Sequence, residues 1–166
     1  MVPMWRSMHL VPETQEGVSA LTLKLPLGSY ASARDIRPEC GLVSEHAWIG
    51  ESNAPRAFYH PDRLSAQLLW FESGEVEYRF SLGEIDPVQV EWLEISMELS
   101  SNAPMYRENF KSDIYVGLGE TELGVWTSPG DYGARRGRFN PSWWSDTLSQ
   151  YGLLKTWRVD NQGCTL

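Results

Sequence analysis

The sequence predicts an all-β protein: an antiparallel β-sandwich of the jelly-roll or galactose-binding-like kind, with little helix. Three observations support this prediction. Several short segments alternate apolar and polar residues with a period of two, turn residues separate them at short intervals, and no amphipathic helical pattern of convincing length occurs. A chain of 166 residues is long enough to bury one substantial core. We expect a single domain over residues 20–166.

The first part of the chain carries the weaker patterns. Residues 1–19 show no clear period and are expected to form a flexible lead-in, or to derive from an expression vector. Residues 21–27 alternate leucine with other residues, which predicts a strand. Pro26 places this strand at an edge or ends it, because proline cannot donate to a ladder. Residues 31–62 are irregular, with a short strand expected over 42–49.

A β-hairpin is predicted next. Residues 64–71 are rich in apolar side chains, Ser73 and Gly74 form a turn signal, and residues 75–80 alternate. A helix over 62–71, capped by Asp62, is the alternative, but pairing with 75–80 favours a strand. This pattern indicates a hairpin with one face in water.

The later part of the chain predicts more strands. Residues 92–99 alternate strongly, and residues 153–159 are a further strand candidate. Between them, residues 114–118 lead through the turn of residues 119–121, which begins with Gly119, into residues 123–127, and this pattern indicates a second hairpin.

The chain is acidic, with a formal net charge of −8. Such a surface repels phosphate backbones, so nucleic acid is a poor partner for these residues themselves. Of the 14 basic residues, 11 are arginine, the residue of bidentate and stacking contacts, which indicates recognition more than solubility. The sequence has neither a long apolar run nor a secretory leader, which predicts a soluble cytoplasmic protein without membrane contact.

The loop over 128–138 is the first candidate binding element. Its glycines and its arginines, Arg135 and Arg136 among them, could form a rim that binds an anion or hydroxyl groups, with Asp131 as a further polar contact. It matches neither a phosphate-binding Walker loop nor a dinucleotide fingerprint. The competing interpretation is an end loop of the sandwich whose arginines pair with nearby carboxylates.

Tryptophans beside this loop are the second candidate. Trp143 and Trp144 are adjacent in the chain, so in a strand one of them would face outward. An exposed indole near polar donors is a common platform for a sugar ring or another planar ligand. The competing interpretation is that these rings fill the core. The candidate ligand-binding residues are therefore Trp126, Asp131, Arg135, Arg136, Trp143 and Trp144.

Catalytic and metal-binding patterns are weak. Cys40 and His46 could ligate a metal or act as nucleophile and base, but no second pair of Cys or His residues supports either role. Cys40 and Cys164 are expected to be free thiols. Acidic residues are abundant, yet most of those over 72–98 fall on the polar side of strands, as on a solvated face. We therefore expect no catalytic residue, no metal and no cofactor.

A series of short runs over about residues 20–160 resembles one bacterial family. The runs are RPECGL at 37–42, IGE at 49–51, PRAFY at 55–59, QLLWF at 67–71, VEYRF at 76–80, LEISME at 93–98, WTSPGD at 126–131, RRG at 135–137, NPSWW at 140–144 and QYGLLKTW at 150–157. The family comprises transcriptional regulators that join an N-terminal winged helix-turn-helix, of the arsenic-repressor type, to a larger C-terminal domain. The resemblance is with that C-terminal domain.

The resemblance implies a module that senses an effector or other small ligand for a transcriptional regulator, and it supplies no catalytic residue. The tryptophans beside polar side chains favour a sugar or another hydroxylated molecule as this ligand. Residues 1–19 are too short for a helix-turn-helix, so DNA would be contacted only through one outside this chain. The family domain usually continues into further strands, which implies either a fragment truncated near Leu166 or a stand-alone relative.

Two other functions remain open at this stage. One is a carbohydrate-active enzyme or a stand-alone carbohydrate-binding module. The other is a dimerisation domain, because tryptophan, tyrosine and arginine also dominate the energetics of protein interfaces, here in a homodimer.

Overall fold

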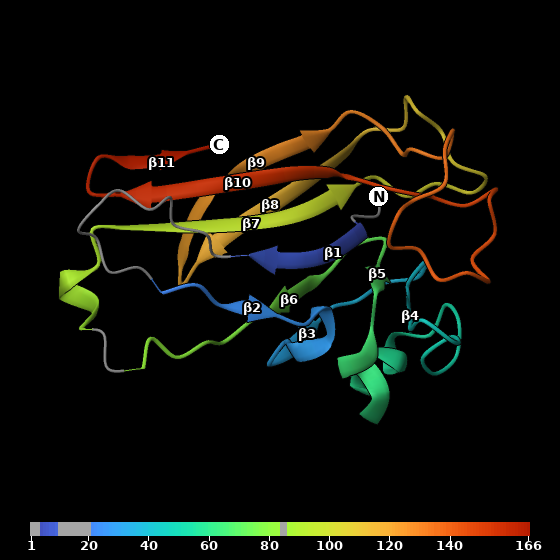
Figure 1. The fold of residues 1–166 in the computed structure, drawn as a ribbon, viewed down its shortest axis with the longest axis horizontal. Coiled ribbons are helices and arrows are strands. Elements are labelled where there is room, and N and C mark those ends of the chain that lie inside the picture. Colours follow the sequence, from blue (N-terminus) through green and yellow to red (C-terminus); the bar gives the residue numbers. More distant parts are fainter. Residues whose placement is uncertain (1–3, 10–20, 84–85) are drawn as a thin grey trace.

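The computed structural model describes residues 4–9, 21–83 and 86–166 (Figure 1). Its regular structure consists of strands in three antiparallel sheets, and the helical elements within these residues are short 3-10 turns. The predicted all-β fold is therefore confirmed, whereas the jelly-roll or galactose-binding-like sandwich stays a prediction. No helix within the described ranges is long and apolar enough to cross a membrane.

The largest sheet has seven strands in the order β11-β10-β7-β1-β5-β4, with β2 also paired to β1. Since β7 pairs along one edge of β1, β2 and β5 share its other edge. The strands are β1 (Met4–His9), β2 (Lys24–Leu25), β4 (Gly41–Val43), β5 (Leu68–Trp70), β7 (Trp92–Ser100), β10 (Leu153–Asp160) and β11 (Gly163–Thr165).

Two small sheets accompany the large one. Strand β3 (Ser32–Arg34) pairs with β6 (Glu75–Glu77), and β8 (Ser112–Leu118) pairs with β9 (Thr121–Ser128). Four 3-10 turns connect these strands. They are η1 (Leu27–Ser29), η2 (Pro55–Tyr59), η3 (Pro61–Ser65) and η4 (Pro87–Gln89).

The strongest sequence patterns give the longest strands. The strands predicted at 92–99 and 153–159 are confirmed as β7 and β10, which pair along their length and place Ile95 opposite Trp157. Both of these side chains are buried. The hairpin predicted over 114–127 is confirmed as β8 and β9, and Gly119 at its turn adopts a positive φ of 60°, which glycine tolerates without strain.

The hairpin predicted between 64–71 and 75–80 is wrong. Strand β5 pairs with β4 and β1, whereas β6 pairs with β3 in a different sheet. The physical reason is burial: Leu68, Leu69 and Trp70 are all buried, so β5 is covered on both faces and lies inside a sheet. A continuous apolar run of this kind has no wet face to share with β6. Residues 61–65, within the range considered for a helix, form η3.

The first part of the chain contains more structure than its patterns predict. The segment 1–19 contains β1, whose backbone pairs with three other strands, and its residues 1–3 and 10–19 lie outside the described ranges. The strand predicted over 21–27 is limited to β2, and Pro26 ends it before η1. The strand predicted over 42–49 corresponds to β4 and a single bridge from Val43 to Trp48.

Hydrophobic side chains pack on both faces of the large sheet. Leu42 and Leu69 are opposite each other in β4 and β5, and both belong to the main core, which also takes in Ala33 of β3 and Ile114 of β8. The small sheets therefore cover this face. Because successive side chains of a strand point to opposite faces, the neighbours of Leu42 and Leu69 face the other way. These neighbours are Val43, Leu68 and Trp70, and together with Trp144 they form a second cluster.

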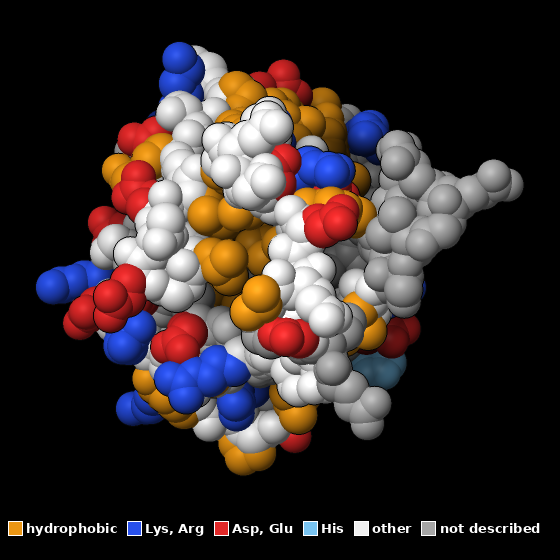
Figure 2. Space-filling view, turned by 90° about the vertical axis from the view of Figure 1, so that its left-hand side faces the viewer, with side chains coloured by type: hydrophobic (Ala, Val, Ile, Leu, Met, Phe, Trp, Pro, Cys, Tyr) orange, Lys and Arg blue, Asp and Glu red, His pale blue; other side chains and the backbone are white. Residues whose placement is uncertain are grey.

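The main core is incompletely covered at one end of the molecule. Figure 2 views the end where the β8–β9 and β10–β11 turns lie, and it shows hydrophobic side chains in the middle of this end with charged side chains at its margin. Leu23, Phe80, Leu93 and Leu123 are among the partly buried hydrophobic residues that pack against the main core. Hydrophobic side chains of the core therefore reach the surface.

Replacement of Leu69 by alanine should destabilise the protein by about 2–5 kcal/mol, because a fully buried leucine leaves a cavity. Leu154→Ala is the matched control: this leucine is 67% exposed, and its loss should change stability by less than about 0.5 kcal/mol. The free energy of unfolding from urea titration measures both. Equal effects of the two substitutions would contradict the described packing.

Candidate functional site

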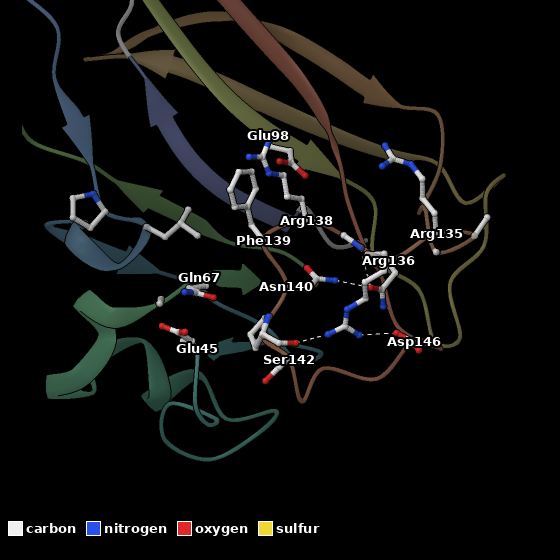
Figure 3. Close-up of a pocket in the computed structure, with 18 of the residues that line it drawn as sticks. Glu45, Gln67, Glu98, Arg135, Arg136, Arg138, Phe139, Asn140, Ser142 and Asp146 are labelled. Carbon is white, nitrogen blue, oxygen red and sulfur yellow. Dashed lines mark hydrogen bonds and ion pairs between the residues drawn. The ribbon is translucent and has the colours of Figure 1, made fainter.

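A cleft of about 1330 Å³ lies beside the loop over residues 133–142 (Figure 3). All ten loop residues line it, together with Asp146 and Gln150. The opposite wall comes from distant parts of the chain: the residues around the end of β2, the turns before β5, and one residue of β7. These residues are Leu25, Pro26, Leu27, Glu45, Ala66, Gln67 and Glu98.

Two glycines allow the loop to lie close to its neighbours. A Cβ atom on Gly133 would lie 2.0 Å from the ring of Tyr106, and a Cβ atom on Gly137 would lie 1.7 Å from the carbonyl oxygen of Gln150. Both distances are too short for any side chain, so only glycine permits this approach. From the sequence, we expect the backbone amides of these glycines to contribute to a ligand-binding rim. In the structure, the two glycines allow the loop to pack closely against Tyr106 and Gln150.

The ends of the segment that contains the loop are held together. Tyr132 and Tyr151 form an isolated antiparallel bridge, and their rings stack with centroids 5.3 Å apart and an interplanar angle of 16°. The guanidinium carbon of Arg135 lies 4.1 Å from the centroid of the Tyr151 ring. Arg135 lines the cleft, and its guanidinium also stabilises the stacked pair of tyrosines.

Arg136 also lines the cleft, and it holds the loop in shape. Its Nη1 donates to Asp146 Oδ1 at 2.6 Å and to the carbonyl oxygen of Trp144, and its Nη2 donates to the carbonyl oxygen of Pro141. These contacts occupy donors that a ligand would otherwise use. The structure thus gives Arg136 a positioning role in the wall of the cleft, in line with the competing interpretation of the loop.

Gln150 is a residue that sequence patterns did not single out. It is fully buried, and its Oε1 accepts from Asn140 Nδ2 at 2.7 Å and from the Gly137 backbone at 3.3 Å. Its Nε2 donates to the carbonyl oxygens of Ser145 and Leu148 at 2.8 and 2.9 Å. A single amide side chain therefore ties the loop to the segment that follows it. No local pattern marks such a residue, because its partners lie up to 13 positions away.

The charges that line the cleft balance one another. Arg135, Arg136 and Arg138 face a set of three acids, Glu45, Glu98 and Asp146. This balance contrasts with the acidic charge of the whole chain. In Figure 3, Glu98, Arg138 and Phe139 are drawn at the upper end of the cleft, with Glu45 and Ser142 at its lower end.

Phe139 offers an apolar surface at the cleft. Its side chain is 62% exposed, and the guanidinium of Arg138 lies 5.4 Å from its ring centroid. Within the described part of the chain, Arg138 forms no ion pair. Arg138 is one of the loop arginines of the predicted rim, but neither Arg138 nor Phe139 is among the candidate ligand-binding residues of the sequence prediction.

Asp131 lies in the interior and does not line the cleft. It is fully buried, and its Oδ2 accepts from the backbone of Ala103 at 2.7 Å. Burial raises the pKa of this carboxyl, while hydrogen bonds from Ser149 and Ala103 act in the opposite direction. Its Oδ1 has no partner among the described residues. Asp131 joins the segment after β9 to the segment after β7.

The three candidate tryptophans do not share one site. Trp126 packs against the main core with the ammonium of Lys155 5.4 Å from its ring. Trp144 is 5% exposed and belongs to the second cluster, as the competing interpretation expects. Trp143 is 37% exposed and lies against Trp144 and Trp48. None of the three lines the cleft.

Cys40 and His46 provide no reactive pair. Cys40 is buried, and burial raises the pKa of its thiol, which disfavours the nucleophilic thiolate. His46 lies in an exposed turn. Within the ranges that the structure describes, no three His, Cys, Asp or Glu residues lie together as metal ligands.

No protein family model, no characterised protein and no solved structure matches this chain. The resemblance to the regulator domain therefore stays a prediction, and function has to be inferred from the cleft and its surroundings.

Substitution of Arg136 by alanine should loosen residues 141–150 and destabilise the protein by about 1–3 kcal/mol, because three charge-assisted hydrogen bonds are lost. Hydrogen exchange of the backbone amides in this segment should accelerate. Arg56→Ala, at an arginine that is 78% exposed, should leave both measurements unchanged. Unaltered exchange in Arg136→Ala would argue against the positioning role.

Asp131→Asn should reduce the pH dependence of stability as pH rises above about 4, the ordinary range of an aspartate carboxyl. Burial raises the folded pKa above the ordinary value of about 3.9. The contribution of this carboxyl to the free energy of unfolding is therefore fully present below its pKa in the unfolded chain and is lost as pH rises through its pKa in the folded protein. Urea titrations across this range measure the slope, with Glu91→Gln at an exposed acid as control. Identical slopes in Asp131→Asn and the parent protein would contradict the effect.

Proposed function

We propose that this chain is a non-catalytic module that binds a small neutral polyhydroxylated molecule of the saccharide class in the cleft beside residues 133–142. The observation that carries the proposal is the cleft lining. It combines three arginines and three acids with amide and hydroxyl side chains and with an exposed aromatic ring.

Each part of this lining suits a sugar. Charged side chains of both signs, such as Arg138 and Glu45, hydrogen-bond hydroxyl groups as donors and acceptors without selecting a charged ligand. An exposed ring such as Phe139 can pack against the apolar C–H face of a sugar, while polar groups fix its orientation. Anions are less favoured, because the acids Glu45 and Glu98 also line the cleft.

A sensing role in a transcriptional regulator is the biological part of the proposal. Its support is the resemblance to the C-terminal domains of regulators with a winged helix-turn-helix. A sugar would change DNA binding by having different affinities for two states of the complete regulator, which we propose to be a cytoplasmic homodimer. DNA would be contacted by the helix-turn-helix and not by this acidic chain.

Hydrolysis of a glycan is less well supported than binding. Two carboxylates of the cleft have structural partners: Asp146 pairs with Arg136, and Glu98 Oε1 accepts from the backbone of Gly152 at 2.7 Å. A glycosidase needs one carboxyl group as acid and another as nucleophile or base. Measured turnover of a bound oligosaccharide would favour the carbohydrate-active enzyme instead.

A thermal-shift screen against common hexoses, pentoses and their disaccharides should identify a ligand, because a ligand at 100 times its Kd stabilises by about 2.7 kcal/mol. Arg138→Ala and Phe139→Ala should each weaken its affinity about tenfold in calorimetric titration, since a lost stacking or charged contact costs about 1.4 kcal/mol. Arg79→Ala, at an exposed arginine outside the cleft, should retain affinity. If no sugar binds, or if the cleft variants bind like the parent protein, the proposed site is refuted.

A further inference from the structure

Two tryptophans form an exposed aromatic surface beside the cleft. Trp48 is 41% exposed and Trp143 is 37% exposed, and their ring centroids lie 6.3 Å apart at an interplanar angle of 50°. They come from segments almost a hundred residues apart in the chain, so only the fold brings them together. The sequence prediction included Trp143 and did not include Trp48.

Buried partners hold both rings in place. Trp48 packs against Trp70 and Trp144 at centroid distances of 5.5 and 6.0 Å, and Trp143 packs against Trp144 at 5.9 Å. Trp70 itself lies against Gly41, where a Cβ atom would be 2.5 Å from its ring. Rings fixed in this way lose little rotamer freedom when a ligand binds, which favours affinity.

The indole N–H of Trp143 already makes a hydrogen bond within the protein. It donates to the carbonyl oxygen of Glu45 at 2.8 Å. This hydrogen bond turns the polar edge of the ring toward the protein, so the surface that remains is the apolar ring. An apolar ring surface suits the C–H face of a sugar better than it suits a ligand that needs a hydrogen-bond acceptor.

The tryptophan pair adjoins the lower end of the cleft. Glu45, which accepts from Trp143, lines the cleft, and so does Ser142, the residue before Trp143 (Figure 3). The cleft volume of about 1330 Å³ exceeds the range of about 300–1,000 Å³ that is usual for small-ligand pockets. The cleft and the tryptophan pair together offer room for more than one sugar ring.

We propose that Trp48 and Trp143 form a second subsite, so that the module binds an oligosaccharide chain rather than a single sugar. One unit packs on the tryptophan pair, and the following units extend past Glu45 and Ser142 into the cleft. This inference rests on the proposed function of the cleft and adds that its ligand contains more than one sugar unit.

A second copy of the chain is a less suitable occupant. Two indoles that are 41% and 37% exposed offer roughly 100–200 Å² of contact area. A stable dimer interface buries about 800 Å² on each partner. The tryptophan pair is therefore large enough for a sugar ring and too small for a protein interface by itself.

The test is calorimetric titration of the whole chain with linear glucose oligomers of one to six units, in the α-1,4 and β-1,4 series, and with β-1,4 xylose oligomers. We expect affinity to rise with chain length by about tenfold in one series, as expected for one added stacking contact. In Trp48→Ala and Trp143→Ala, the ratio of hexamer to monomer affinity should fall to about one. Trp48→Phe, which keeps an aromatic ring, should retain most of the gain.

Tyr115→Ala is the matched control, because this aromatic residue on β8 is 63% exposed and outside both subsites. It should bind hexamers like the parent protein. Circular-dichroism melts identify any variant that fails to fold, in which case Trp48→Phe and Trp48→Leu are compared instead. If affinity still rises with oligosaccharide length in both alanine variants, the second subsite is overturned. So does sedimentation that shows a dimer in the parent protein and a monomer in Trp48→Ala.

The outcomes separate the two proposals. If a monomer binds and Arg138→Ala weakens it, but affinity does not rise with length, the second subsite fails and the cleft function stands. If hexamer binding is lost in Trp48→Ala but unchanged in Arg138→Ala, the tryptophan subsite stands and the cleft function fails. If no oligomer of any length binds, both fail.

Discussion

The cleft depends on one requirement: the backbone of the segment between β9 and β10 must find hydrogen-bond partners without a strand ladder. Buried N–H and C=O groups that lack partners are costly, so long irregular segments need side chains to replace a ladder. Gln150 and Arg136 supply these partners, one from the interior and one from the edge of the cleft. Asp131 fixes the start of the same segment to the backbone after β7. Three polar side chains thus give an irregular segment a defined shape.

This segment also explains why the large sheet carries hydrophobic residues on both faces at one end. It brings Trp144 onto the side of β4 and β5 that the small sheets leave uncovered, and Val43, Leu68 and Trp70 pack there. The same packing fixes Trp48 and Trp143, whose outer surfaces stay exposed. The proposed binding surface and the second cluster are therefore built from neighbouring residues. A substitution that fills or empties this cluster should change the positions of Trp48 and Trp143 as well as stability.

The sequence predicts the local structure of this protein better than it predicts which strands pair and which distant side chains are in contact. Alternation identifies β7 and β10, and a glycine turn identifies the β8–β9 hairpin, because these signals lie within a few residues of each other. The β5–β6 hairpin fails because burial on both faces, a property of the whole fold, decides where β5 pairs. The loop arginines line the cleft, but their role as ligand-binding residues stays a prediction, and the structural role of Arg136 and the proximity of Trp48 to Trp143 depend on contacts that no local pattern shows.

Four indoles within contact distance also give the folded chain an optical property. Five pairs among the rings of Trp48, Trp70, Trp143 and Trp144 have centroids 5.5–6.3 Å apart. Chromophores this close couple their electronic transitions and pass excitation among themselves. We therefore expect the quartet to absorb as a coupled unit in which two members, Trp48 and Trp143, are partly exposed to solvent. The near-ultraviolet dichroism of the pairs that include Trp143 or Trp144 should be lost when the segment after β9 leaves the sheet, whereas the Trp48–Trp70 pair does not depend on that segment.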